Sequence, residues 1–283
     1  MTNPQRHEDI FSSIIQCYNN LTKSETKVAD FVLHNRHRIH ALSISELAAA
    51  CDVSEATVSR FCHTVGSSSF NEFKLAAVHF SSSMDSLGLD MDLYSTLQPG
   101  DTVAQKCRKL CSVSMEALQQ TLHELDEDAI SKAVDIFSKA KSVYCFGQGN
   151  SGIVAEDAWG RFSTVSTKFH FISNANLQAT TAHLLGEGDV VLYFSFSGSV
   201  RELTEVGQML AGTKAKLVLV TRFPNAPGTQ FADLLLICGA NEAPQQQGSI
   251  AAKIGQLFIV DVLFHEFCAR NQITSVFSSP DMY

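Results

Sequence analysis

The sequence lacks several features that mark special classes of protein. Its eight cysteines include no C-x-x-C pair, and it has only six prolines and sixteen glycines in 283 residues. A disulfide or zinc framework is therefore not indicated, and a fibrous or low-complexity chain is excluded. No apolar run approaches the roughly 18 residues that span a bilayer, and the first nine residues carry no apolar signal core. We expect a soluble cytoplasmic protein.

Hydrophobic residues make up 45% of the sequence and charged residues 18%, with a net charge of −8. This length and hydrophobic content suffice for one large core or two smaller ones, so two domains are a reasonable expectation. The charge is uneven, because residues 1–80 hold seven Lys and Arg against eight Asp and Glu. The overall acidity argues against bulk non-specific binding to nucleic acid but leaves room for a small module that reads DNA locally.

The hydrophobic pattern divides the sequence into three parts. Residues 1–80 have a helical pattern, and residues 81–101 are rich in Ser, Asp and Gly, which indicates a linker. Residues 102–283 begin with two helices and then alternate between short apolar runs and helical segments. Strands are predicted at 142–146, 168–172, 189–195, 216–221 and 233–238, and helices at 153–165, 175–185, 199–211, 226–232 and 248–270. The pattern predicts an α/β protein in which an all-helical N-terminal domain precedes a doubly wound, five-stranded parallel sheet.

Residues 44–65 predict two short helices joined by a tight turn. Ser43 and Glu46 form a capping box for the first helix, and Ser54 is a hydroxyl cap for the second. The second helix is expected to end at Gly66, because glycine favours the left-handed conformation that follows many helices. Hydrophobic positions with the spacing of one small core are Leu47, Ala48, Cys51, Val53, Val58 and Phe61. Such a pair is typical of a helix-turn-helix unit, whose second helix can enter the major groove of DNA.

The second of these helices carries side chains suited to DNA. An arginine can bind guanine or phosphate, and serine and threonine hydroxyls can bind bases or backbone. The residues expected at the helix start or on its outer side are Ser54, Glu55, Thr57, Ser59 and Arg60. A helical hairpin that contacts another protein is the alternative. His34, His37 and His40 could suggest a metal site, but no fourth ligand accompanies them.

Three stretches of the N-terminal part, LTKSETKVADFVLHN, SISELAAACDVSEATVSRF and FNEFKLA, carry a family resemblance. Over about residues 8–80 the sequence resembles the DNA-binding domain of RpiR-type bacterial transcription regulators. Asp52 occupies a turn position where the family usually has glycine, although Asp tolerates the left-handed conformation better than most residues. GSSSF at 66–70 replaces a more basic G-F-K-G-[FY] stretch. The resemblance implies that Lys74 also contacts DNA, and the missing lysine implies weaker or differently distributed operator contacts.

Two loops rich in glycine and serine follow neighbouring strands of the predicted sheet. In the first loop, Gly147, Gly149 and Gly152 match G-x-G-x-x-G, the dinucleotide-binding fingerprint, at the start of a helix. That fingerprint also requires an acidic residue about 20 residues later, at the end of the second strand. Residues 171–176 contain none. A nicotinamide or flavin site is therefore not favoured, and we assign the protein no cofactor.

The loop after the third predicted strand reads Ser195-Phe196-Ser197-Gly198-Ser199 and leads into a helix. Hydroxyls, main-chain amides and the positive end of a helix dipole can bind an anion without a cationic side chain. A ligand there would lie in the crevice at the carboxyl ends of the strands. An ordinary serine-rich helix cap is the alternative, but two such loops after neighbouring strands favour phosphate.

Three further stretches, VYCFGQGNSGIVAEDA, DVVLYFSFSGSVRELTEV and LVLVTRFPNAPGTQFADLLL, resemble the SIS (sugar isomerase) phosphosugar-binding domain over about residues 125–270. The resemblance implies that both loops bind the phosphosugar, through Gly149, Asn150, Ser151, Ser195, Ser197, Gly198 and Ser199. It also implies a role for Glu156, which either binds a sugar hydroxyl or caps a neighbouring group.

These features together predict a DNA-binding transcription regulator, a homodimer or homotetramer, whose operator affinity is controlled by a phosphorylated sugar. The alternative is a sugar-phosphate isomerase, which needs a general acid and base. Candidates for those roles are His183, Glu187, Glu156 and Glu242. The His-rich segment typical of arabinose-phosphate isomerases is not present, so the regulator is preferred. The sequence leaves open the sugar, the operator, and the choice between repression and activation.

Overall fold

The computed structural model describes residues 10–85, 97, 99–239 and 250–273 of a chain that forms two compact units. The described residues of the first unit, here called the helical domain, lie within 10–116. Those of the second, here called the sheet domain, lie within 117–239 and 250–273. The division falls inside helix α6 (Val103–Glu124), which the sequence assigned as a whole to the sheet domain. Residues 86–96 and 98 of the expected linker lie outside the described residues, so the linker stays a prediction.

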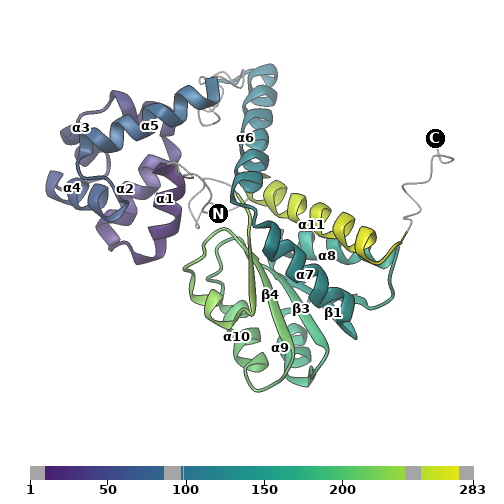
Figure 1. Cartoon of the computed structure of the whole chain (residues 1–283). Helices are drawn as coiled ribbons and strands as arrows, with labels where there is room; N and C mark the ends of the chain where they lie inside the picture. Colours follow the sequence, from purple (N-terminus) through teal and green to yellow (C-terminus); the bar gives the residue numbers. More distant parts are fainter. Residues whose placement is uncertain (1–9, 86–96, 98, 240–249, 274–283) are drawn as a thin grey trace, which may run out of the picture. The chain divides into compact units, whose positions relative to one another are not determined.

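Five helices make up most of the helical domain (Figure 1). They are α1 (Ile10–Cys17), α2 (Lys23–His34), α3 (Ile44–Ala50), α4 (Glu55–Thr64) and α5 (Phe70–Asp85). Short 3₁₀ turns at Tyr18–Asn20 and Arg36–Ala41 connect α1 to α2 and α2 to α3. Helix α5 continues to Asp85, and its last five residues lie in the segment that the sequence assigned to the linker.

The first turns of these helices follow the capping signals in the sequence. A reciprocal capping box joins Ser43 to Glu46 at the start of α3, and another joins Thr22 to Glu25 at the start of α2. At the start of α4, the Ser54 side chain accepts a hydrogen bond from the Thr57 amide. Each cap satisfies backbone donors that have no partner inside the helix.

The core of the helical domain contains the small cluster predicted from the helix-turn-helix pattern. Leu47, Val58 and Phe61 are fully buried, and Ala48 and Cys51 nearly so, whereas Val53 is only half-buried. Phe61 packs edge-on against Phe73 of α5, with ring centroids 5.7 Å apart. The recognition-helix candidate α4 is therefore fixed to its neighbours by its apolar side.

The sheet domain contains a five-stranded parallel sheet. Its strands are β1 (Ser142–Gly147), β2 (Phe169–Phe171), β3 (Asp189–Phe194), β4 (Lys216–Thr221) and β5 (Leu234–Ile237). The order across the sheet is β2-β1-β3-β4-β5, and every neighbouring pair is parallel. The order reverses between β1 and β3, which is the switch point where doubly wound sheets bind ligands.

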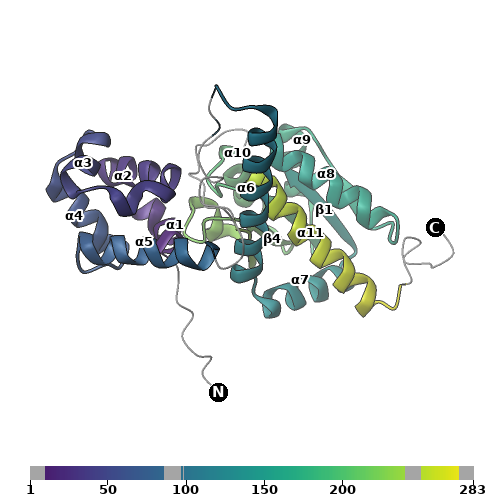
Figure 2. The same cartoon turned by 90° about the horizontal axis from the view of Figure 1, so that it is seen from above.

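Helices cover both faces of this sheet (Figures 1 and 2). Residues of α7 (Glu127–Lys139), α8 (Gly149–Ser163) and α11 (Ile250–Arg270) form one apolar cluster with the strands. Residues of α9 (Ala175–Leu184) and α10 (Arg201–Leu210) form the cluster on the other face. The helix predicted at 226–232 is a single 3₁₀ turn, Pro227–Phe231. The predicted doubly wound parallel sheet is confirmed.

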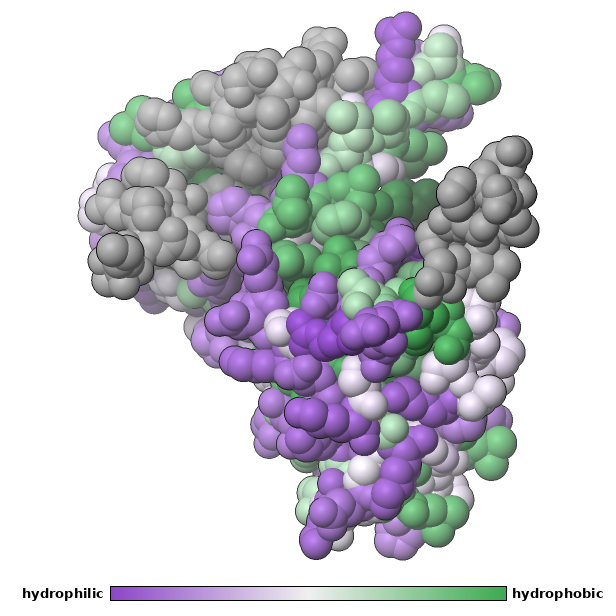
Figure 3. All heavy atoms as spheres, turned by 45° about the vertical axis from the view of Figure 1, so that its right-hand side comes forward, coloured by the Kyte–Doolittle hydropathy of each residue, from purple (hydrophilic) through white to green (hydrophobic). Residues whose placement is uncertain are grey.

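One face of the sheet domain is largely polar in its lower part. On the face drawn in Figure 3, hydrophilic residues cover most of the lower half, where helices of this domain lie. Within the described ranges, no helix combines the length and apolar content needed to cross a membrane.

All eight cysteines are free thiols. Five of them are buried, and burial raises the pKa of Cys51 to about 11 and that of Cys62 to about 12. Buried thiols of this kind stay protonated and unreactive near neutral pH. Cys107 and Cys111 are instead exposed, one turn apart on α6.

Candidate functional sites

The turn between α3 and α4 has the tight geometry that the sequence predicts. Asp52 adopts the left-handed conformation with φ of 51°. The Val53 amide donates to the Ala48 carbonyl at 3.0 Å, and the Asp52 amide donates to the Ala49 carbonyl at 3.2 Å, which together form a Schellman motif. The Asp52 carboxylate lies 3.2 Å from the Lys27 ammonium. Aspartate thus takes the place of the family's glycine while the helix-turn-helix geometry is kept.

The outer side of α4 presents three of the five residues predicted for DNA contact. Ser54, Glu55 and Arg60 are exposed, and Ser59 is half-buried. Thr57 lies in the first turn of α4, as expected, but is only 5% exposed, and a DNA contact by Thr57 stays a prediction. Its hydroxyl lies 3.0 Å from the Ser54 hydroxyl and accepts a hydrogen bond from Arg60 Nη2 at 3.3 Å. Thr57 therefore orients the N-terminal cap and the arginine instead of facing solvent.

A buried carboxylate fastens α4 to α2. Glu25 accepts hydrogen bonds from the Thr22 hydroxyl at 2.7 Å and from the Thr64 hydroxyl, on α4, at 3.2 Å. Burial alone would raise the pKa of Glu25, but these hydrogen bonds and the Arg60 charge outweigh it and hold the pKa below its usual value. The exposed end of Arg60 therefore projects from a helix that is fixed at both ends.

Lys74 is half-buried and interacts within its own domain. Its ammonium lies 5.7 Å from the centre of the Phe70 ring, and its charge helps to lower the pKa of Glu46, after the larger effect of the Ser43 hydrogen bonds. The serines that replace the family's basic stretch cap α5, because Ser69 accepts a hydrogen bond from the Glu72 amide at 3.2 Å. DNA contact by Lys74 stays a prediction.

In the sheet domain, the glycine-rich loop and the serine-rich loop follow the two strands at the switch point. Gly147, at the end of β1, is paired in register with Phe194, at the end of β3. A Cβ atom at Gly147 would lie 2.6 Å from the Ser151 carbonyl oxygen, so only glycine allows α8 to begin this close to the strand. Gly149 has φ of 55°, and no side chain caps the first turn of α8. The amides of this turn are therefore available to an anion.

The serine-rich loop is held in one conformation by close backbone packing. Gly198 has φ of 61°, and a Cβ atom there would lie 2.6 Å from the Ala226 Cβ and 2.9 Å from the Thr221 hydroxyl. The Gly198 carbonyl accepts a hydrogen bond from the Gly228 amide at 2.8 Å. These contacts fix the direction in which the neighbouring hydroxyls point.

The serines of this loop differ in their surroundings. Ser195 is 3% exposed, and its hydroxyl has no hydrogen-bond partner within the residues that the structure describes. Ser197 accepts a hydrogen bond from the Ser199 amide at 3.3 Å, and Ser199 is exposed just before α10 begins at Arg201. A buried hydroxyl without a partner is uncommon in folded proteins, and a bound ligand would satisfy it.

Two glutamines that sequence reasoning missed hold the glycine-rich loop. Gln178 of α9 is fully buried, and its amide nitrogen donates to the Gly147 carbonyl at 3.2 Å and to the Ile172 carbonyl at 2.6 Å. Gln256 of α11 accepts a hydrogen bond from the Ser151 hydroxyl at 3.3 Å. The one available signal was a polar residue within a buried helical face, which does not identify its partner.

Two of the four candidate acid and base residues, His183 and Glu187, lie away from these loops. His183 lies in the last turn of α9, and Glu187 comes just before β3 begins, so both lie toward the amino edge of the sheet. Glu187 pairs there with Lys214 at 3.2 Å. The two loops lie at the carboxyl edge of the sheet. Because β3 has six residues, that edge is about 20 Å from the amino edge. Glu242 lies outside the described residues. Glu156 is exposed on α8 with no hydrogen bond or ion pair to any described residue.

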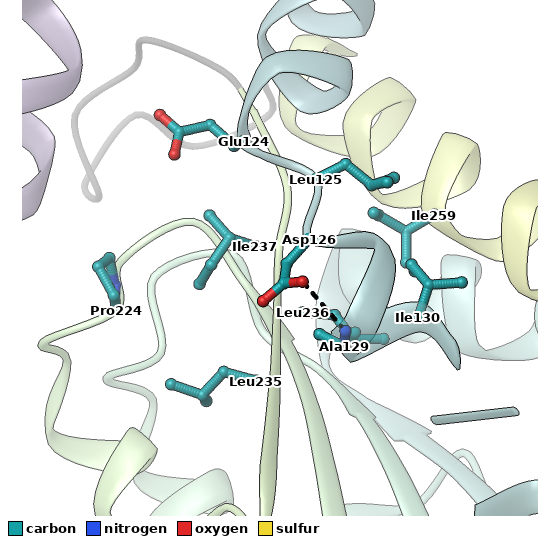
Figure 4. Close-up of a pocket in the computed structure, with 10 residues that line it drawn as sticks. All are labelled: Glu124, Leu125, Asp126, Ala129, Ile130, Pro224, Leu235, Leu236, Ile237 and Ile259. Atoms are coloured by element: carbon teal, nitrogen blue, oxygen red, sulfur yellow. Dashed lines mark hydrogen bonds between the residues drawn. The ribbon is translucent and has the colours of Figure 1, made fainter. Parts of the chain in front are cut away.

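A separate pocket of about 220 Å³ lies beside the edge strand β5 (Figure 4). Its walls are mainly apolar and include Leu235 and Ile237. Its two charged side chains, Glu124 and Asp126, are both acidic, and Figure 4 shows Asp126 turned toward the Ala129 amide that it caps. Two carboxylates disfavour a phosphorylated ligand, so this pocket is not the candidate phosphosugar site.

Comparison with known proteins agrees with both halves of this description. The family "Helix-turn-helix domain, rpiR family" matches residues 9–83, and "SIS domain" matches residues 136–266. An uncharacterised HTH-type transcriptional regulator of Caldanaerobacter subterraneus is 31% identical over 90% of this chain and 89% of its own length. HexR, an HTH-type transcriptional regulator of Escherichia coli, is 30% identical over 88% of this chain and 84% of its own length.

Among solved structures, the Vibrio vulnificus NanR protein complexed with ManNAc-6P shares the fold, with a TM-score of 0.57, 24% identity and 93% of each chain covered. A helix-turn-helix joined to a doubly wound SIS domain defines a class of transcriptional regulator. The chain belongs to the RpiR family of this class.

We expect Gly198→Ala to destabilise the sheet domain by about 2 kcal/mol or more, because a side chain there combines left-handed strain with contact at Ala226. Chemical unfolding of the whole chain measures the change. The control is Gly212→Ala, where a Cβ atom would meet nothing within 4 Å, and we expect a change of no more than about 0.5 kcal/mol. Equal stability of the two variants would show that the serine-rich loop is not fixed by this packing.

Proposed function

We propose that the operator affinity of this regulator is controlled by a phosphorylated sugar bound at the switch point of the sheet domain. The observation that carries the proposal is the pairing of two preorganised loops there. One presents the uncapped first turn of α8, and the other presents the buried, unpartnered hydroxyl of Ser195. Amides and hydroxyls of this kind suit a phosphate group.

The ligand class has support from a protein of the same fold. The structure of Vibrio vulnificus NanR was determined with ManNAc-6P, which is a phosphorylated sugar. The position of the candidate acid and base residues supports a regulator without isomerase activity, because His183 and Glu187 lie away from the loops. Steady turnover of a pentose or hexose phosphate by the purified chain would contradict this part of the proposal.

On the DNA side, we propose that α4 enters the major groove with Arg60, Ser54, Glu55 and Ser59 at the interface. Arg60 is the strongest candidate, because its exposed guanidinium can make two parallel hydrogen bonds to guanine or phosphate. Thr57 contributes indirectly through its hydrogen bond to Arg60.

Two copies of α4 would read a near-palindromic operator with half-sites about one helical turn apart, or a multiple of that. We therefore extend the proposal to a homodimer, or a dimer of dimers. Helix α6 offers a surface for it, because it carries several exposed apolar side chains along its length. They are Val103, Leu110, Met115, Leu118 and Leu122.

We expect Arg60→Ala to weaken operator binding by about 10- to 100-fold, the loss typical of one good side-chain contact to a base. Fluorescence anisotropy with operator DNA at fixed salt measures it. Lys132→Ala, which removes an exposed cation of α7, is the control and should leave the affinity unchanged. Wild-type affinity of the Arg60 variant would remove Arg60 from the interface.

We expect the double substitution Ser197→Ala, Ser199→Ala to abolish stabilisation by phosphorylated sugars while operator binding without ligand is retained. A thermal-shift screen of a phosphosugar panel that includes ManNAc-6P provides the measurement. Bound ligand at 100 times Kd stabilises a protein by about 2.7 kcal/mol, which such a screen detects readily. A sugar phosphate that stabilises the variant as much as the wild type would place the site elsewhere.

We expect the chain to be a dimer in sedimentation experiments, and expect Leu110→Lys with Leu122→Lys to shift it toward monomer by placing charge in an apolar interface. The matched control is Leu184→Lys on α9, because Leu184 is also exposed, at 77%. A dimer that resists the α6 substitutions as well as it resists the control would mean that another surface joins the copies.

A further inference from the structure

Gln256 is a buried side chain whose hydrogen-bonding capacity is only half used. It is 1% exposed, and its amide oxygen accepts a hydrogen bond from the Ser151 hydroxyl. Its amide nitrogen is buried and has no hydrogen-bond partner among the described residues. Buried donors in folded proteins nearly always have partners, so this one calls for an explanation.

Gln178 shows how a glutamine with a purely structural role is arranged in the same domain. Its nitrogen donates to two carbonyls, and its oxygen accepts from the Gln148 side chain at 2.8 Å. Every polar atom of Gln178 is therefore used by the protein itself. Gln256 differs because its buried donor, next to Ser151 in the first turn of α8, has no partner in the described part of the chain.

Gly255, the residue before Gln256 in α11, is packed tightly against the C-terminal part of α6. A Cβ atom at Gly255 would lie 2.4 Å from the Gly239 carbonyl oxygen and 2.9 Å from the Thr121 hydroxyl. The Thr121 hydroxyl accepts a hydrogen bond from the Gly239 amide at 2.8 Å and donates to the Ala117 carbonyl at 2.7 Å. A shift of α11 at this point therefore moves α6 or breaks these contacts.

We propose that Gln256 is the residue through which the sheet domain senses its ligand. Its amide nitrogen donates to a phosphate oxygen of the bound phosphorylated sugar, beside Ser151. The new bond fixes α11, and the contact of Gly255 with Thr121 passes the change to α6, which continues into the helical domain. This proposal rests on the proposed function, because it assigns the phosphate to the same loops.

The binding step is tested with Gln256→Glu and Gln256→Met. The first keeps an acceptor for Ser151 but replaces the donor by a carboxylate, and the second removes both polar atoms with little change in length. Both should bind inorganic phosphate and ManNAc-6P at least about 10-fold more weakly, as expected for the loss of a hydrogen bond to a charged group. Gln208→Met, at an exposed position of α10, is the control and should bind both as the wild type does.

Calorimetric titration of the full-length chain gives these affinities, and circular dichroism shows whether each variant folds. Wild-type affinity for inorganic phosphate in either folded Gln256 variant overturns the binding step. If the affinity for ManNAc-6P falls while the affinity for inorganic phosphate does not, Gln256 contacts the sugar and the assignment to phosphate is wrong. Loss of binding in the double serine variant together with wild-type affinity in the Gln256 variants would leave the proposed function standing and remove only this inference.

The transmission step is tested with Gly255→Ala, which forces α11 and α6 apart, and with Thr121→Val, which removes the hydroxyl contact without added bulk. Each should bind inorganic phosphate and ManNAc-6P within about 3-fold of wild type, but ManNAc-6P should no longer change operator affinity. In the wild type that change is expected to be about 5- to 150-fold. A full response in either folded variant overturns the route through α6.

Discussion

The candidate phosphosugar site depends on how closely the backbone can approach itself at the ends of β1 and β3. A side chain at Gly147 would collide with the Ser151 carbonyl, and one at Gly198 would collide with Ala226. These two glycines let α8 start directly beside its strand and hold the serine-rich loop against β4. The amides and hydroxyls are consequently fixed before any ligand arrives. A preorganised site loses little conformational entropy on binding, which favours affinity even without a strong charge.

The electrostatics of this region agree with a site built from dipoles. Arg222, directly after β4, is almost fully buried, and its amide donates to the Phe196 carbonyl of the serine-rich loop at 3.0 Å. Its guanidinium lies 3.4 Å from the Glu124 carboxylate, which offsets much of its charge. A buried ion pair adds little net stability, but the loss of either partner leaves an uncompensated charge. Arg222 is therefore better suited to hold the loop and α6 together than to attract an anion over a distance.

Local signals in the sequence predicted the features that depend on near neighbours. The capping box of Ser43 and Glu46, the left-handed Asp52 and the stop at Gly66 each involve residues within a few positions of one another, and all are present. The burial of Thr57 could not be predicted, because helical spacing alone does not show that its hydroxyl is used by the cap of α4. The roles of Gln178 and Gln256 could not be predicted for a different reason. Their partners are about 30 and 105 positions away, and only the folded sheet brings them together.

The same long-range contacts underlie the proposed link between ligand binding and DNA binding through α6. Thr121 joins α6 to the end of β5 and to the part of α11 that reaches Ser151. Glu124, one turn further, joins it to Arg222 and so to the serine-rich loop. Both loops at the switch point are thus connected to the last two turns of a single helix of 22 residues. A helix of that length extends about 33 Å. Because α6 begins in the unit that holds α4 and ends in the unit that holds both loops, the proposed coupling runs along the helix itself.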